Sequence, residues 1–323
     1  MNHYPSNVKE KLNSIILSMA EHHWLFSKNP GHDFTRQHLG KLSFYDTMRL
    51  IISMGKGSTN DEIMDYFDLD PDLIPSQSAF CQRRRQISLS AFEYLFSEFS
   101  SSFPSTTDKF KDHCILACDG CHVVYATNSD IIEDYNKPRL IDYKGYNHMH
   151  LNGFVDVISK AFLDVVIQPG QQPDEREALH SMLDHFTPDD PQKYIITADR
   201  GYESYDLLFH CELKNLGYVF RVKSPSSPKS ILSYYVSEFP DDLEDFDVTI
   251  KRFFTDKATN IMKSQSDVYR YINPSKNTPH FYELLRKKHS HLYFLQFRVV
   301  KIKTAGISKT GNLFPPDSVQ FRH

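Results

Sequence analysis

Residues 194–204 read YIITADRGYES, and this stretch decides the kind of sheet that the chain forms. A short apolar run rich in β-branched residues predicts a buried strand. The run ends on Asp199, and a buried strand gains nothing from a terminal carboxylate. We therefore interpret Asp199 as a ligand at a strand tip, where Gly201 lets the chain turn away sharply. The alternative is a cap for the helix that begins near Glu203.

Amphipathic helices are predicted on both sides of this strand. Residues 174–186 carry apolar side chains at helical spacing. The second helix, residues 203–217, ends at Gly217, a residue suited to the left-handed position that follows a helix. Strands are predicted over 114–127, 145–159, 160–169 and 218–224. The order β-β-β-α-β-α-β predicts an α/β fold, with a mixed sheet and helices on its faces.

The first 103 residues have a different pattern, which predicts a helical region. Thr59, with Glu62 three residues later, predicts a capping box at the start of one helix. Ser76 is expected to cap the next helix, which carries three consecutive arginines, Arg83, Arg84 and Arg85. Two short helices with a basic second member suggest a helix-turn-helix that binds DNA. A small helical bundle with a solvated arginine face is the alternative.

Domain boundaries follow from these changes in pattern. We expect a helical DNA-binding region over 1–103, a mixed-sheet core over 104–224, a β-rich insertion over 225–303 and an atypical tail without a clear element over 304–323. Charge is divided unevenly, with 8 basic and 16 acidic residues in 104–199 but 12 basic and 3 acidic in 251–303. This division fits an enzyme that binds metal at its acidic segment and a polyanion at its basic segment, although ordinary surface charge explains it equally well.

Composition and cysteine spacing limit the protein class. Hydrophobic residues make up 40% and charged residues 24% of the 323, which is typical of a soluble globular protein. No apolar run approaches the ~18 residues of a membrane helix, and the N-terminus does not resemble a signal peptide, so we expect a cytoplasmic protein. Cys118 and Cys121 have C-x-x-C spacing, but no second ligand pair follows. Thiols that fill space in a strand are the favoured interpretation.

Asp119 and Asp199 form the candidate site. The first and fourth predicted strands are neighbours in a sheet of this order, so the two acids are expected to face each other. Carboxylates that close repel unless a cation lies between them, and Mg²⁺ suits such a site. Arg200 would contact phosphate or brace a carboxylate. A simple Asp119-Gly120 turn is the alternative, and His148 and His150 are expected to be hydrogen-bonded strand residues rather than ligands.

Several longer stretches then resemble a known family. The segments LACDG, YKGYNHMHLNGFVDVISKAFLDVVIQPG, EREALHSMLDHF and TADRGYES look like a DDE transposase of the insertion-sequence IS-four-like group, over roughly residues 30–303. The resemblance implies a ribonuclease-H-like core with Asp119 and Asp199 as the first two catalytic acids. It also implies Mg²⁺, with Mn²⁺ able to substitute, and double-stranded DNA at transposon ends and targets, bound by a homodimer.

The sequence departs from this family at the third acid. The family pattern is Tyr, two residues, Arg, three residues, Glu, six residues, Lys; Tyr218 and Arg221 begin it, but Pro225 stands at the Glu position. Glu283 has helical neighbours but lies in the predicted insertion. The third acid is therefore unknown, and we expect a truncated or frameshifted chain with reduced catalysis. The alternatives are a DNA-binding-only inhibitor of full-length transposase and an unrelated metal-dependent phosphoesterase.

Overall fold

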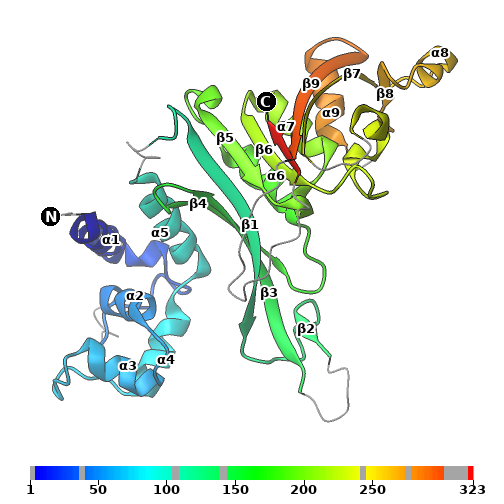
Figure 1. Cartoon of the computed structure of the whole chain (residues 1–323). Coiled ribbons are helices and arrows are strands. Elements are labelled where there is room, and N and C mark those ends of the chain that lie inside the picture. Colours follow the sequence, from blue (N-terminus) through cyan, green and yellow to red (C-terminus); the bar gives the residue numbers. More distant parts are fainter. Residues whose placement is uncertain are drawn as a thin grey trace. The chain divides into compact units, whose positions relative to one another are not determined.

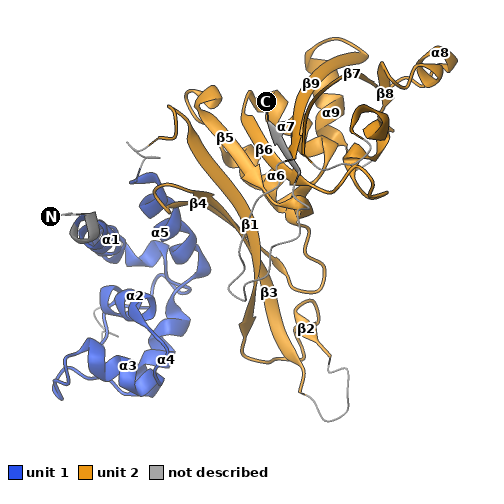
Figure 2. Cartoon of the chain, viewed as in Figure 1, with its two compact units in different colours: residues 1–104 blue, residues 105–323 orange. Residues whose placement is uncertain are grey.

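The computed structural model describes residues 4–35, 41–103, 109–137, 144–240, 245–273, 278–301 and 319–322. The chain divides into two units, residues 1–104 and 105–323 (Figure 2).

The first unit is helical. Its elements are α1 (Tyr4–Glu21), the 3₁₀ helix η1 (His23–Leu25), α2 (Phe44–Ser53), α3 (Thr59–Tyr66), α4 (Gln77–Gln86) and α5 (Leu89–Ser101). Two apolar clusters hold these helices together. One joins α1, α2 and α5 through residues such as Ile16, Met48 and Ala91, and the other joins α2, α3 and α4 through Leu50, Ile63 and Phe80.

Serine hydroxyls cap the starts of α2, α3 and α4. Ser76 caps α4 as predicted, by accepting a hydrogen bond from the Ala79 N–H at 3.2 Å. The predicted Thr59 capping box is wrong, because Ser58 is the cap of α3 and accepts from the Asp61 N–H. Glu62 instead reaches back to the N–H groups of the two preceding glycines, at 2.9 and 2.7 Å.

The second unit contains the sheet (Figure 1). Its strands are β1 (Cys114–Tyr125), β2 (Tyr135–Asn136), β3 (Tyr146–Asp156), β4 (Phe162–Pro169), β5 (Tyr194–Ala198), β6 (Gly217–Val222), β7 (Phe246–Thr255), β8 (Tyr269–Tyr271), β9 (Leu292–Lys301) and β10 (Val319–Arg322). Its helices are α6 (Glu175–His185), α7 (Tyr205–Lys214), α8 (Asn260–Ser264) and α9 (Pro279–Lys287), with short 3₁₀ helices η3 (Pro191–Lys193), η4 (Arg200–Tyr202) and η5 (Ile231–Glu238).

The strands are ordered β2-β3-β1-β5-β6-β10-β9-β7-β8, with β4 also paired to β3. β1 pairs with β3 in antiparallel fashion, whereas β5 pairs in parallel with both β1 and β6. This confirms the predicted mixed sheet with flanking helices. The connection from β5 to β6 contains α7, and the longer connection from β1 to β5 contains β2, β3, β4 and α6. Parallel strands require crossover connections of this kind.

Strand alternation separates a buried face of the sheet from a more open one. Leu116 and Cys118 of β1 point into the core with Phe154 of β3, and the apolar faces of α6 and α7 cover them. Ala117 and Asp119 therefore point to the other face, because successive strand residues alternate. We call this second surface the Asp119 face.

The end of α7 and the presence of β10 differ from the sequence prediction. α7 ends at Lys214, and its cap residue Asn215 adopts the left-handed conformation with φ 55°, whereas the predicted Gly217 already opens β6. The prediction of no clear element over 304–323 is wrong for 319–322, since β10 pairs with β6 and β9. The rest of that segment lies outside the described residues.

The first turn of α9 is held by another helix. Its N-cap residue, Thr278, makes no side-chain cap, and Asp206 of α7 instead accepts hydrogen bonds from the N–H groups of His280 and Phe281 at 3.0 and 3.2 Å. The predicted insertion thus contains helices as well as strands, and α9 is fastened to the core.

Candidate active site

The two predicted acids lie at neighbouring positions of adjacent strands. β1 and β5 are paired in parallel up to Cys118 and Ala198; Asp119 is the next residue of β1, and Asp199 directly follows the end of β5. The expectation that these strands are neighbours is confirmed. Asp119 does not lie in a turn, because β1 continues through its pairing with Gly153 of β3.

Local hydrogen bonds orient each carboxylate. Asp119 Oδ1 accepts from the Gly120 N–H at 2.9 Å, and Asp199 Oδ1 accepts from the Gly201 N–H at 2.6 Å. Asp199 therefore caps the short η4, whereas Ser204 caps α7. Both acids are exposed. In the part of the chain that the structure describes, their Oδ2 atoms receive no hydrogen bond, so these oxygens are available to a cation.

A third carboxylate, which the sequence reasoning missed, meets Asp199 above Gly201. A Cβ built on Gly201 would lie 2.8 Å from Glu175 Oε2 and 3.0 Å from Asp199 Oδ1. A larger residue at position 201 would therefore push these two carboxylates away from their present positions. Hard oxygen donors from two separate elements fit the divalent ions that prefer carboxylates. The signal was the Asp174-Glu175 pair at the start of α6, but acids are common in a first helical turn.

Histidines of β1 and β3 surround this acidic edge. His150 Nε2 lies 3.5 Å from Glu175 Oε1, and the His150 ring occupies the space beside Gly120. Burial, followed by the neighbouring His122, lowers the pKa of His150. His148 is buried and hydrogen-bonded to Asn136, as predicted for a strand histidine. His150 is thus the histidine that lies against the acidic edge, through its contact with Glu175.

The C-x-x-C spacing does not make a metal site. Cys118 and Cys121 are three residues apart on one strand, so their thiols point to opposite faces. Cys118 is buried beside Tyr202, and burial raises the pKa of its thiol to about 12. A thiol that resists ionisation is a poor zinc ligand, so the space-filling interpretation is confirmed for Cys118. Cys121 is exposed.

The three consecutive arginines of α4 differ in environment, because adjacent helical residues point about 100° apart. Arg83 is half-buried, with its guanidinium 5.2 Å from the centre of the Phe34 ring. Arg84 and Arg85 are exposed. Arg200 is exposed directly after Asp199. DNA or phosphate contact by these side chains stays a prediction.

Glu283 does not complete the acidic site. It is exposed on α9 and interacts electrostatically with Lys214, at the last turn of α7. Asp199 precedes the first turn of the same helix, which is 10 residues long. At 1.5 Å per residue, Glu283 therefore lies about 15 Å along the helix from the acid pair.

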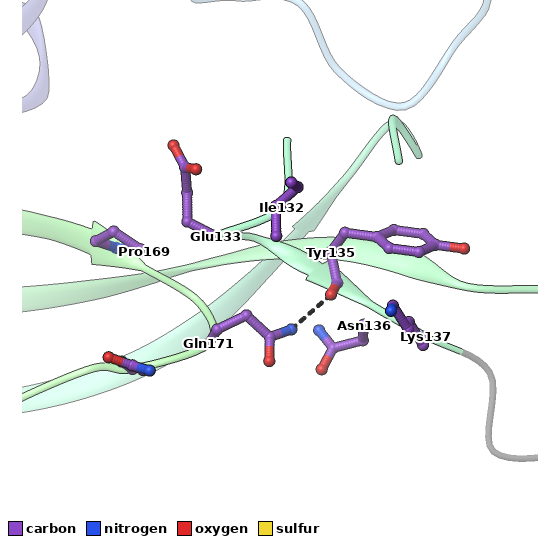
Figure 3. A pocket seen from close by; sticks show the side chains of 8 residues that line it. Ile132, Glu133, Tyr135, Asn136, Lys137, Pro169 and Gln171 are labelled. Carbon is purple, nitrogen blue, oxygen red and sulfur yellow. Dashed lines mark hydrogen bonds between the residues drawn. The ribbon is translucent and has the colours of Figure 1, made fainter. Parts of the chain in front are cut away.

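A cavity of about 810 Å³ lies elsewhere, beside β2 and the end of β4 (Figure 3). Its wall includes Glu133, Lys137 and Gln171, whose Nε2 donates to the Tyr135 carbonyl at 2.7 Å. None of the three acids lines it, so the cavity is separate from the candidate site.

The sequence matches a known protein family. A family model described as the transposase DDE domain matches residues 110–291, more than half of the chain. The chain belongs to the transposase DDE domain family. The match contains Asp119, Glu175 and Asp199, and the mixed sheet is consistent with the ribonuclease-H-like fold of DDE transposases. A comparison with curated proteins finds no match.

Membership of this family supports transposase function, a DNA substrate and the use of divalent metal ions. Among the described residues, no helix is both long and apolar enough to span a bilayer.

Proposed function

We propose that this chain is a transposase of the IS-four-like group. Its first 103 residues bind transposon-end DNA, and the acidic edge of its sheet cleaves DNA strands. It acts as a homodimer on DNA. The observation that supports the proposal is the parallel register of β1 and β5, in which Asp119 and Asp199 are the residues that follow the last pair, Cys118 and Ala198. Residues 104–224 then supply the catalytic core.

The residues of the chain give this edge its chemistry. Asp119, Asp199 and Glu175 concentrate negative charge and would hold Mg²⁺ or Mn²⁺. Such ions, when bound, activate an attacking oxygen and stabilise a leaving one in phosphodiester cleavage. Arg176 Nε donates to the Gly201 carbonyl at 3.2 Å, which holds the turn that orients Asp199. Arg200, exposed beside it, supplies positive charge for a DNA phosphate.

We further propose that these 323 residues by themselves have impaired catalysis. The sequence contains no Tyr-x2-Arg-x3-Glu-x6-Lys pattern to supply the third acid on a helix. The Asp119 face supports this idea, because its apolar side chains are poorly covered. Ile167 is 62% and Phe162 47% exposed on β4, beside half-buried Val165. A further helix that carries the third acid would bury these side chains at the position of Asp119.

A second candidate function follows from the lack of the family's third-acid pattern in this sequence. If the metal site is too weak without the third acid, the chain still presents an arginine-bearing helix and a basic segment over 251–303. It would then bind transposon ends without cleaving them and inhibit full-length transposase.

Nicking of labelled end DNA in Mg²⁺ or Mn²⁺ separates the two functions. Metal-dependent nicking that disappears in Asp199→Ala and Asp119→Ala supports the transposase. Glu175→Gln should reduce nicking, whereas its exposed neighbour on the same helix, Glu177→Gln, should not. Binding without nicking, with a steep salt dependence from phosphate contacts, supports the inhibitor. Indifference to DNA in both assays would refute both functions.

A further inference from the structure

Three histidines from three helices meet at a place that the transposase chemistry does not use. They are His180 of α6, His210 of α7 and His280 of α9. One ring nitrogen from each lies within 4.8 Å of the others. The ring centres of His280 and its two neighbours are 4.2 and 3.9 Å apart, and His180 and His210 are buried.

The outer nitrogen of each ring faces a carboxylate. His280 Nδ1 lies 2.7 Å from Asp206 Oδ2, and His180 Nε2 lies 3.5 Å from the same oxygen. His210 Nε2 lies 3.2 Å from Asp184 Oδ1. Metal-binding histidines usually donate their second N–H to such an acceptor, which fixes the tautomer and leaves the other nitrogen to the metal.

The inner nitrogens of His180 and His210 point toward each other. Their Nδ1 atoms are 2.9 Å apart. While both rings are neutral this contact holds one proton, which a metal ion can replace.

We propose that His180 Nδ1, His210 Nδ1 and His280 Nε2 bind a divalent transition-metal ion of the Zn²⁺ type. Imidazole favours zinc, cobalt and nickel, whereas magnesium prefers oxygen ligands. Tetrahedral zinc with bonds of about 2.0–2.1 Å needs ligand nitrogens about 3.4 Å apart. His180 Nδ1 and His210 Nδ1 are 2.9 Å apart, and the three ligand atoms all lie within 4.8 Å of one another. The rings now lie within 18° of parallel, so they must turn for their nitrogens to converge on the ion.

The surroundings provide access to the ion. A cavity of about 250 Å³ is lined by the rings of His180 and His280 and by Asp184, Asp206 and Ser204. It gives the ion an entry path and room for water as the fourth ligand. Asp184 and Asp206 act as hydrogen-bond acceptors for the histidines, so the site differs in ligand type from the all-carboxylate acid site.

The role of this site is structural. It joins α6 and α7 of the core to α9, which lies between β8 and β9. Because the bound ion favours the folded state, it stabilises the attachment of α9. The proposal does not depend on DNA cleavage.

Thermal unfolding of the full chain, stripped with chelator and then titrated with Zn²⁺, tests the site. At a hundredfold excess over the dissociation constant, we expect the melting temperature to rise by about 5 °C or more, with about one zinc retained per chain after desalting. The same concentration of Mg²⁺ should not reproduce the shift. Co²⁺ should give the visible absorption of a low-coordinate imidazole complex.

Histidine substitutions test which side chains are responsible for the zinc-induced rise in melting temperature. His280→Gln and His210→Gln should lose the zinc-induced shift, and the less buried His280 provides the test if His210→Gln does not fold. His185→Gln is the matched control, since this exposed histidine ends the same helix as His180 and pairs with Asp164. Asp199→Ala should also keep the shift. The proposal is overturned if zinc does not raise the melting temperature, if His280→Gln keeps the full shift, or if Asp199→Ala loses it.

Discussion

Replacing Asp206 with alanine is expected to lower the free energy of unfolding by about 3–5 kcal/mol. The carboxylate is only 2% exposed and accepts from the backbone N–H groups of His280 and Phe281 and from the His280 ring. Alanine leaves both backbone donors without an acceptor, and each buried orphan donor costs about 1–3 kcal/mol. The His280 ring adds little, because it is partly exposed and can turn toward water.

Urea unfolding, followed by far-ultraviolet circular dichroism in the presence of chelator, measures the effect apart from any metal. With a slope of about 2 kcal/mol/M, a loss of about 4 kcal/mol lowers the midpoint by about 2 M. Asp164→Ala is the matched control, because among the described residues that carboxylate pairs with the exposed His185 ring and accepts from the Val165 N–H of its own strand. Partly exposed pairs of this kind contribute about 0–1 kcal/mol.

A loss below about 1 kcal/mol for Asp206→Ala, or one no larger than that of the control, would refute the reasoning. It would mean that the first turn of α9 finds another acceptor at little cost. The attachment of α9 to the core would then depend on apolar packing alone.

Three further predictions concern function and chemistry. Changing Arg84 and Arg85 together to alanine should weaken end-DNA binding at least about tenfold and lower the salt slope by about two, as measured by fluorescence anisotropy; unchanged affinity would place the contact elsewhere. Glu175→Gln should reduce Mn²⁺ affinity about tenfold by electron paramagnetic resonance titration, and equal affinity would exclude it as a ligand. Cys118, with its pKa raised to about 12 by burial, should resist iodoacetamide at pH 8 while exposed Cys121 reacts; equal labelling rates in the folded protein would contradict the assigned burial.

Features set by local pattern could be predicted from the sequence. The strands and helices of the core follow from periodicity, and the adjacency of β1 and β5 follows from strand order and crossover connections. Two nearby residues that suit the same position explain the errors at the start of α3 and the end of α7. Ser58 and Thr59 are both suitable caps, and Asn215 and Gly217 both tolerate the left-handed conformation, so spacing alone does not choose between them.

Features set by contacts between distant elements could not be predicted in this way. Glu175 belongs to the site because the η4 turn brings Gly201 under the start of α6. The three-histidine cluster depends on how α9 returns to α6 and α7, and nothing in the spacing of His180, His210 and His280 reports that return. β10 is only four residues long, and its place follows from the free edges of β6 and β9 rather than from its own pattern.

The parallel pairing of β1 with β5 also has a consequence for biosynthesis. β1, β3 and β4 form an antiparallel meander that can pair as soon as residue 169 has left the ribosome. Asp119 and Asp199 are 80 residues apart (199 − 119), so the acid pair forms only after this longer segment closes. A nascent chain shorter than 199 residues therefore lacks the pair. Because the chain folds from its N-terminus, the helical region is complete before the acid pair can form.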